Sequence, residues 1–403
     1  MYSVADLPAR ALWRTLLTCV VCVPVMFCLA ACGSSGILSS GSWQAGGLQN
    51  QSLRVLAVNG KDLQNLYVGN VQGHIFMSDN AGQSWSEHSA GLPLPDPIHA
   101  LSFDISSQKL YAATDRGLFT TTAGATRWSL LSALPPTSFT SLTFDPGATA
   151  VMYVGTASRG VYRSDNGGGA WTAVSKGLPA GAAVNYLSFD PVQHQVWAAT
   201  AAGAYLSSDR GASWQSFNGG IPAGITINTI VPASTVGGTT GLLYMGTNHG
   251  IYLSQDFGAH WSAPQEALSG TSIRAILLDF RSTNPIALDV ATDVGVFTSA
   301  DNGQSWSSVA SDLPRNAPIY ALALGTDNYA QLYAAGDGIY LFPGNGGGIA
   351  PTRILPLILV AAFFFLLYWL SQRGRNRRRA AIKLATTQAE PVAKADDPPA
   401  TSA

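Results

Sequence analysis

The sequence predicts an all-β protein, because one pattern of short strands and a tryptophan returns along most of its 403 residues. Tryptophans recur at intervals of 42 to 47 residues from Trp43 to Trp306. Each interval holds four short alternating segments, rich in aromatic and β-branched residues and separated by Gly, Pro, Asp and Asn. No stretch from 43 to 345 has helical periodicity of useful length. A four-stranded unit with a period in the forties is typical of a β-propeller.

The four strands of each repeat are recognised by their residues. The first strand is apolar and often ends in Asp, as in "VNYLSFDP" (184–191). The second resembles "LYVGN" (66–70), the third begins with Gly as in "GVYRS" (160–164), and the fourth starts at the tryptophan. The recurring tryptophans are Trp43, Trp85, Trp128, Trp171, Trp214, Trp261 and Trp306.

The two ends of the repeat region are incomplete in complementary ways. Trp43 opens a fourth strand with no other strand before it, whereas the last unit (316–342) has three strands and no fourth. Joining them gives seven complete units. We therefore predict a single seven-bladed β-propeller over 43–342, closed by its N-terminal strand. Closure would also remove the strand edges that an open ring exposes.

A short motif stands between the third and fourth strands, as in "SSDRGASW" (207–214), "SQDFGAHW" (254–261) and "SADNGQSW" (299–306). Asn replaces Asp in "SDNAGQSW" (78–85) and "SDNGGGAW" (164–171), and "TTAGATRW" (121–128) is eroded. The motif resembles the Asp-box, or BNR repeat, of sialidases, sortilin-like receptors, xyloglucan hydrolases and photosystem II assembly factors. The resemblance covers about 43–342 and implies a propeller whose boxes lie away from the working face.

The box residues have a structural interpretation. The Asp or Asn side chain can accept hydrogen bonds from turn N–H groups, the Gly can adopt a positive φ, and the tryptophan can pack as an apolar plug. We assign this role, rather than a calcium-binding or catalytic one, to Asn80, Asn166, Asp209, Asp256, Asp301, Trp85, Trp171, Trp214, Trp261 and Trp306.

A polar residue stands near the start of every first strand, where it would ring the mouth of the central channel. This rim column is Arg54, His99, Thr140, Asn185, Asn228, Arg274 and Tyr320. The turns between second and third strands add Gln72, Asp115, Arg116, Arg159, Asn248, His249, Asp293 and Asp337. Either these positions are polar because strand starts are solvated, or they recognise a polar ligand. The ligand-binding hypothesis rests on Arg54, His99, Asn185, Asn228, Arg274, Tyr320, Arg116, Arg159 and His249.

An enzymatic function is the alternative. Resemblance to sialidases would imply three convergent Arg and a Tyr nucleophile activated by Glu, but the rim column offers only Arg54 and Arg274. The propeller's two Glu residues, Glu87 and Glu266, follow box tryptophans instead. Xyloglucan hydrolases use paired Asp in a cleft between two propellers, and one is predicted here. We therefore expect a non-catalytic scaffold for a protein or glycan; the alternative is a glycoside hydrolase using rim carboxylates.

Charge and composition restrict the partners. Residues 43–345 carry twelve Lys and Arg against nineteen Asp and Glu, a net charge of −7. Nucleic acid is not expected, because phosphate binding needs a basic surface. The photosystem II assembly factors carry a basic patch, which this acidic ring lacks. The six His residues show no metal-ligand spacing, and no Gly-rich phosphate loop precedes a helix, so neither a metal nor a cofactor is predicted.

The N-terminus is typical of an export signal. Arg10 and Arg14 precede an apolar run that ends in "LAAC" at 29–32. The ending resembles a bacterial lipobox, which predicts a signal peptide over 1–32 and acylation of Cys32. The alternative is an uncleaved signal anchor in which Cys32 is an ordinary thiol. Residues 33–42 form a short tether in either case.

The C-terminus predicts a membrane span. After a Gly-rich linker (343–353), residues 354–372 carry no charge and would span roughly 28 Å as a helix, close to the thickness of a hydrocarbon core. Six positive charges follow within 373–383, which predicts a cytoplasmic tail (373–403) that becomes disordered. We therefore expect the propeller on the extracytoplasmic side of a bacterial cell membrane.

Overall fold

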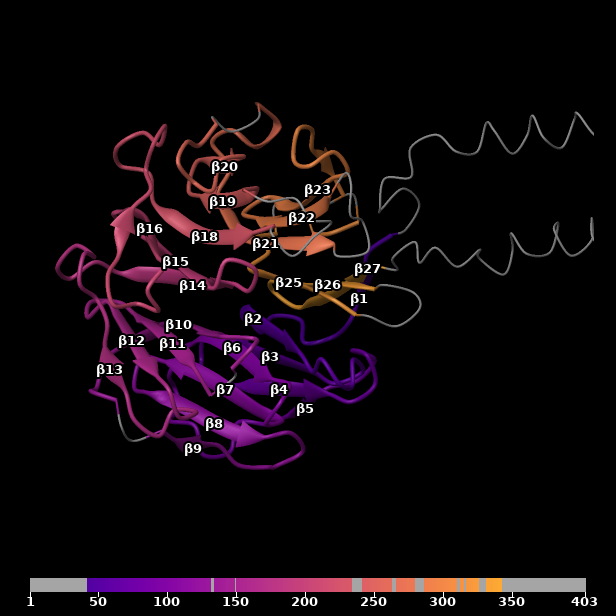
Figure 1. Cartoon of the computed structure of the whole chain (residues 1–403). Coiled ribbons are helices and arrows are strands. Elements are labelled where there is room, and N and C mark those ends of the chain that lie inside the picture. Colours follow the sequence, from indigo (N-terminus) through magenta and orange to yellow (C-terminus); the bar gives the residue numbers. More distant parts are fainter. Residues whose placement is uncertain are drawn as a thin grey trace, which may run out of the picture. The chain divides into compact units, whose positions relative to one another are not determined.

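The computed structural model describes residues 42–342, apart from 132–133, 149, 234–240, 263–265, 280–285, 310–311, 315–316 and 326–330. These residues form seven antiparallel sheets arranged as the blades of a propeller (Figure 1). The predicted signal peptide, tether, linker, membrane span and tail lie outside them. Within the described residues, no helix has the length and apolar character needed to cross a membrane.

Each blade begins with an inner strand. The inner strands are β2 (Leu53–Val58), β6 (Ile98–Asp104), β10 (Phe139–Phe144), β14 (Val184–Asp190), β18 (Ile227–Pro232), β21 (Ile273–Asp279) and β25 (Ala321–Leu324). The second strands are β3 (Leu66–Asn70), β7 (Lys109–Thr114), β11 (Met152–Thr156), β15 (Gln195–Thr200), β19 (Leu243–Thr247), β22 (Ala287–Thr292) and β26 (Leu332–Ala335). We number the blades 1 to 7 in this order.

The outer half of each blade is shorter. The third strands are β4 (Ile75–Ser78), β8 (Leu118–Thr122), β12 (Val161–Ser164), β16 (Gly203–Ser207), β20 (Gly250–Ser254), β23 (Gly295–Ser299) and β27 (Ile339–Phe342). The outermost strands are β1 (Gln44–Ala45), β5 (Ser86–Glu87), β9 (Ser129–Leu130), β13 (Thr172–Ala173), β17 (Gln215–Ser216) and β24 (Ser307–Ser308). In blade 5 the described residues form three strands, followed by a short 3₁₀ helix, η1 (Glu266–Leu268).

The N-terminal strand completes the last blade, as the sequence predicts. The sheet of blade 7 has the order β1-β27-β26-β25, in which Gln44 pairs with Leu341 and Ala45 with Tyr340. Each inner strand packs against the next, and β25 packs against β2, so the ring is closed. The prediction of seven blades with N-terminal closure is confirmed.

The core consists of seven apolar clusters, one at each seam between neighbouring blades. The second strands contribute most to it, because they are buried along nearly their whole length. A large aromatic side chain recurs at one position of six second strands: Tyr67, Tyr111, Tyr153, Trp197, Tyr244 and Tyr333, each exposed by no more than 2%. Neighbouring blades therefore pack face to face, and this packing fixes the positions of their strand ends relative to one another.

Candidate functional site

The rim column predicted from the sequence coincides with a series of β-bulges. In blade 1, Leu53 pairs with Asn70 and Val55 pairs with Gly69, so that Arg54 is an extra residue without a partner on β3. The same shift occurs in the next five inner strands, and it leaves His99, Thr140, Asn185, Asn228 and Arg274 bulged. Tyr320 stands just before β25. A bulge redirects its side chain, and this explains why a polar residue recurs there.

In blades 3 to 5, the bulged side chain joins its blade to the next one. Thr140 Oγ1, Asn185 Nδ2 and Asn228 Nδ2 each donate to the carbonyl oxygen just before the following bulge, the two Asn bonds at 2.8 Å. The acceptors are the carbonyl oxygens of Val184, Ile227 and Ile273. These three donors are therefore engaged within the protein.

In blade 2, the side chain of the bulged residue contacts a carboxylate instead. His99 Nε2 lies 2.8 Å from Asp115 Oδ1, and Ser138 Oγ donates to the same oxygen at 2.6 Å. Partial burial raises the pKa of Asp115, but the hydrogen bonds from Ser138 and His99 outweigh it and lower the pKa. Asp115 is thus held as an ionised carboxylate with two partners.

Blades 1, 6 and 7 bring three column residues together. The guanidinium carbon of Arg54 lies 3.5 Å from the centroid of the Tyr320 ring, and that of Arg274 lies 4.6 Å from it. Both are cation–π contacts. Ring closure makes them possible, because β25 lies between β21 and β2. We call Arg54, Tyr320 and Arg274 the arginine cluster.

The arginine cluster is not neutralised by the part of the chain that the structure describes. Neither guanidinium lies within 4.0 Å of a carboxylate of a described residue, and the buried Nε of Arg274 has no hydrogen-bond partner there. An unpaired buried donor is destabilising. The cluster thus holds two positive charges without a carboxylate partner among the described residues, on a ring whose net charge is −7.

The other predicted binding residues do not join the cluster. Arg116, Arg159 and His249 are exposed in the turns between second and third strands. The backbone N–H of each donates to a Thr hydroxyl at the preceding strand end. Arg116 N–H also donates to Asp96, and the Arg159 carbonyl accepts from Ser175. Among the residues described, no contact joins their side chains to the arginine cluster. They are solvated turn residues in this structure.

The boxes lie at the opposite ends of the strands and form tight turns. In each, the Asp or Asn oxygen accepts the backbone N–H four residues later at 2.8 or 2.9 Å. The box Gly and the residue before it both have positive φ, as in Arg210 (59°) and Gly211 (89°). Two successive left-handed residues account for the conserved spacing within the repeat. The acceptors are Asn80, Asn166, Asp209, Asp256 and Asp301.

The recurring tryptophans join the blades. Five indole N–H groups donate to a carbonyl three residues beyond the tryptophan of the preceding blade, as in Trp214 to Val174 at 2.6 Å. The other four are Trp43, Trp85, Trp128 and Trp261. Trp171 and Trp306 donate to the Gly of their own box. Trp85 and Trp171 are half-buried, and the other five are exposed by 8% or less.

A hollow of about 450 Å³ lies among the inner strands of blades 2 to 6. Its wall includes four aromatic side chains, Phe103, Phe144, Tyr186 and Phe189, and no carboxylate of a described residue lines it. Tyr186 is 40% exposed because it faces this hollow, yet the surrounding protein raises the pKa of its phenol. The described wall therefore holds no pair of carboxylates of the kind that a glycosidase site needs.

Comparisons with known proteins confirm the fold. No protein-family model matches the sequence. A xyloglucanase from Hypocrea jecorina (strain QM6a) is 33% identical over 100 residues, which are 25% of this chain and 12% of that enzyme. The chain thus spans about an eighth of the length of this relative.

Solved structures match over most of the propeller. YCF48 from Cyanidioschyzon merolae superposes with a TM-score of 0.57 at 15% identity, covering 75% of this chain and 98% of that one. YCF48 bound to D1 peptide gives 0.60 at 18%, covering 77% and 99%. The GH74 xyloglucanase from Xanthomonas campestris gives 0.58 at 18%, covering 78% and 55%. At these identities the likeness shows the fold alone, which is a seven-bladed β-propeller.

Proposed function

We propose that this seven-bladed Asp-box propeller is a non-catalytic binding module that recognises an anionic group of a protein or glycan ligand. The observation that carries the proposal is the arginine cluster, with two guanidinium groups on one Tyr ring and no carboxylate partner among the described residues. Among the similar structures, YCF48 is bound to a peptide, and the GH74 proteins are xyloglucanases. Both ligand classes therefore have precedent on this fold.

The arginine cluster is suited to an anion for three reasons. Two neighbouring guanidinium groups repel each other, and a carboxylate or phosphate between them relieves the repulsion. Arg presents donors in a fork that matches both anions with two parallel hydrogen bonds. Contact with Tyr320 orders both side chains beforehand, which lowers the entropy lost on binding.

Binding to the detergent-solubilised full-length protein tests the proposal. The probes are immobilised peptides with free or amidated C termini, and polygalacturonate. Arg54→Ala and Arg274→Ala should each weaken binding of the anionic probe about tenfold or more, because a hydrogen bond to a charged group contributes about 1.5–3 kcal/mol. Arg116→Ala and Arg159→Ala remove exposed arginines outside the cluster and should change it little. Equal loss in all four variants would indicate general charge attraction and contradict the proposal.

A glycoside hydrolase is the second candidate, favoured by the 100-residue match to a xyloglucanase. It needs two carboxyl groups about 5–10 Å apart. The described rim turns supply Asp115, Asp293 and Asp337, and the two partners of Asp115 hold it ionised. Release of reducing ends from xyloglucan by the full-length protein, abolished by Asp115→Asn, would establish the enzyme and overturn the binding module.

Membrane attachment is part of the proposal. It is supported by "LAAC" at 29–32 and the uncharged run 354–372, and both attachments would leave from blade 7, which β1 and β27 share. Cys32→Ala should abolish palmitate labelling in a bacterial host, while Cys28→Ala should leave it unchanged. Undiminished labelling of Cys32→Ala would instead favour an uncleaved signal anchor.

A further inference from the structure

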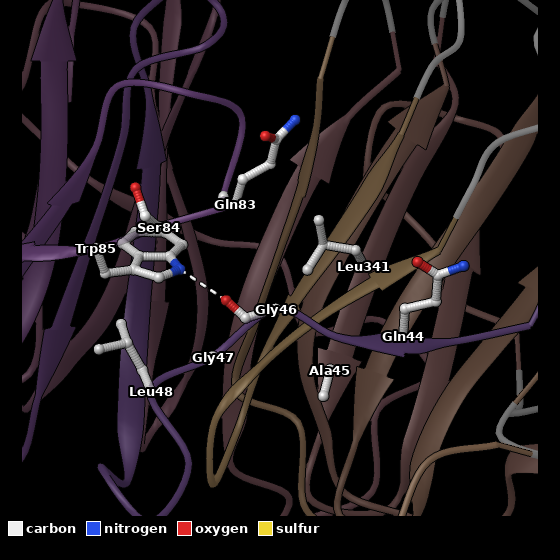
Figure 2. Close-up of a pocket in the computed structure, with 10 residues that line it drawn as sticks. Gln44, Ala45, Gly46, Gly47, Leu48, Gln83, Ser84, Trp85 and Leu341 are labelled. Atoms are coloured by element: carbon white, nitrogen blue, oxygen red, sulfur yellow. Dashed lines mark hydrogen bonds between the residues drawn. The ribbon is translucent and has the colours of Figure 1, made fainter.

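A second hollow, of about 580 Å³, opens where the N-terminal strand meets the box of blade 1. Figure 2 shows Trp85 and Ser84 on one side of it and Gln44 and Leu341 on the other. The hollow lies at the box ends of the strands, away from the arginine cluster, and none of the described residues that line it is charged. We call it the seam pocket.

The seam pocket lies at a seam where the box Gly has a different neighbour. At two other seams, the residue three beyond a tryptophan packs against the box Gly of the next blade, Leu131 against Gly168 and Val174 against Gly211. Here the equivalent residue is Gly46, and Leu341 lies beside the box Gly82 instead. The indole of Trp85, which donates to the Gly46 carbonyl at 2.8 Å, is left half-buried.

The Asn in the blade 1 box frees a hydroxyl group. Asn80 Oδ1 accepts the backbone N–H of Ser84 at 2.9 Å, so its amide nitrogen faces Ser84 Oγ at 2.7 Å. An amide nitrogen only donates, and Ser84 Oγ must accept, which keeps its own hydrogen available. In the Asp boxes, by contrast, Ser213 and Ser305 donate to the Asp carboxylate at 2.5 Å.

Two side-chain amides complete the wall. Gln44 and Gln83 are exposed, and among the described residues neither amide has a hydrogen-bond partner. Among the described residues, the seam pocket thus combines one half-buried indole, two donor–acceptor amides and one donor hydroxyl, with no charge. An anion would find no cation in this described wall, and an apolar chain would cover the amides without pairing them.

We infer that the seam pocket binds a neutral carbohydrate. A sugar ring offers an apolar C–H face to the indole of Trp85 and hydroxyl groups to Gln44, Gln83 and Ser84, so each group in the wall gains a partner. The volume of the seam pocket, about 580 Å³, lies within the range found for small-molecule binding pockets. This site is separate from the proposed anion site, and either can fail without the other.

Asn80→Asp tests the inference without disturbing the fold. It converts the box to the Asp form found in blades 4, 5 and 6. The new carboxylate takes the hydrogen of Ser84 and places a negative charge beside the pocket. Asn166→Asp is the matched control, because its box has Ala170 in place of the serine. Thermal unfolding should show that neither variant is less stable than the original protein.

The binding assay uses the detergent-solubilised full-length protein and neutral hexasaccharides of glucose, xylose and mannose, measured by calorimetry. We expect the original protein and Asn166→Asp to bind at least one of them. Asn80→Asp and Gln83→Ala should each weaken binding about tenfold, the loss of about one hydrogen bond. Arg54→Ala and Arg274→Ala should have no effect.

Three results would overturn the inference. They are no binding by the original protein at about 10 mM sugar, unchanged binding by Asn80→Asp, or loss of sugar binding on mutation of Arg54 but not of Asn80. The third result would place the sugar at the arginine cluster, and the proposed function would stand while the seam pocket would not.

Discussion

The carboxylates of the Asp boxes are held ionised by the turns that they close. The backbone N–H and the side chain of His260 lower the pKa of Asp256 to about 2. The hydroxyl and backbone N–H of Ser213 lower the pKa of Asp209. In an unfolded chain these bonds are absent, and an Asp titrates near 3.8. Each of these boxes therefore adds stability to the fold when its Asp is ionised.

Acid unfolding should expose this dependence. Because the folded pKa is the lower one, the contribution is fully present above about pH 4 and is lost as the pH falls towards 2. Replacing Asp209, Asp256 and Asp301 by Asn should flatten the fall in the free energy of unfolding between those values. Asn80 and Asn166 show that the turn accepts the amide. Urea unfolding at several pH values measures the free energy of unfolding. If its pH dependence were the same in the triple variant, the prediction would be wrong.

At the scale of the element, the blade seam depends on the tryptophan of each fourth strand. Trp214 is 4% exposed, and its indole N–H donates a hydrogen bond to the preceding blade. Trp171 is half-buried, and its indole N–H donates to a carbonyl of its own box turn. The two residues occupy equivalent places in neighbouring repeats. Their contributions to stability should therefore differ although the sequence motif is the same.

Trp214→Ala should lower the free energy of unfolding by about 3–5 kcal/mol, as other large aromatic truncations do. Trp171→Ala should lower it by less, because less of its ring leaves water on folding. Chemical denaturation of the two variants makes the comparison. A loss below about 1 kcal/mol for Trp214→Ala would mean that its ring is not part of the core.

The strands and boxes could be predicted from the sequence, since a repeat displays its own period. The rim column was also visible, because a polar residue precedes each apolar run. The bulge was not, because it depends on the register between two strands, which one strand's residues do not show. The sequence also could not show that Arg54 contacts the Tyr320 ring whereas Asn228 donates a hydrogen bond to the next blade. That difference depends on the neighbouring blade.

For the whole molecule, the ring is closed by a very short strand. Two residues of β1 pair with β27, and Trp43 adds an edge-on contact with Phe342, at 5.2 Å between ring centroids, and a hydrogen bond to the Val309 carbonyl. Trp43 is only 6% exposed. Backbone hydrogen bonds continue beyond β1, from Gly46 N–H to the Ile339 carbonyl and from Ile339 N–H to the Gly47 carbonyl, so closure combines a buried aromatic ring with backbone pairing.

A fragment that begins at Ser52 should reveal this. It lacks β1 and Trp43, which uncovers the apolar strand Ile339–Phe342 and invites pairing between molecules. We expect the fragment 41–345 to be monomeric and to unfold cooperatively. The fragment 52–345 should aggregate or lose several kcal/mol, on the order of one large aromatic truncation. Urea unfolding and size-exclusion chromatography compare them, and equal behaviour would exclude a stabilising role for closure.

The pairing of β1 with β27 also means that the ring can close only at the end of protein synthesis. The ribosome makes β1 at the start of the propeller and β27 at its end, so the first strand waits while all the other blades are completed. Separation along the chain adds little to the free energy of closure, because loop entropy grows only slowly with length. The time before closure has the larger consequence, because the incomplete ring exposes an open end that can aggregate during synthesis. A circular permutant whose chain starts between two other blades would have the same contacts in the folded ring but would form them in a different order during synthesis.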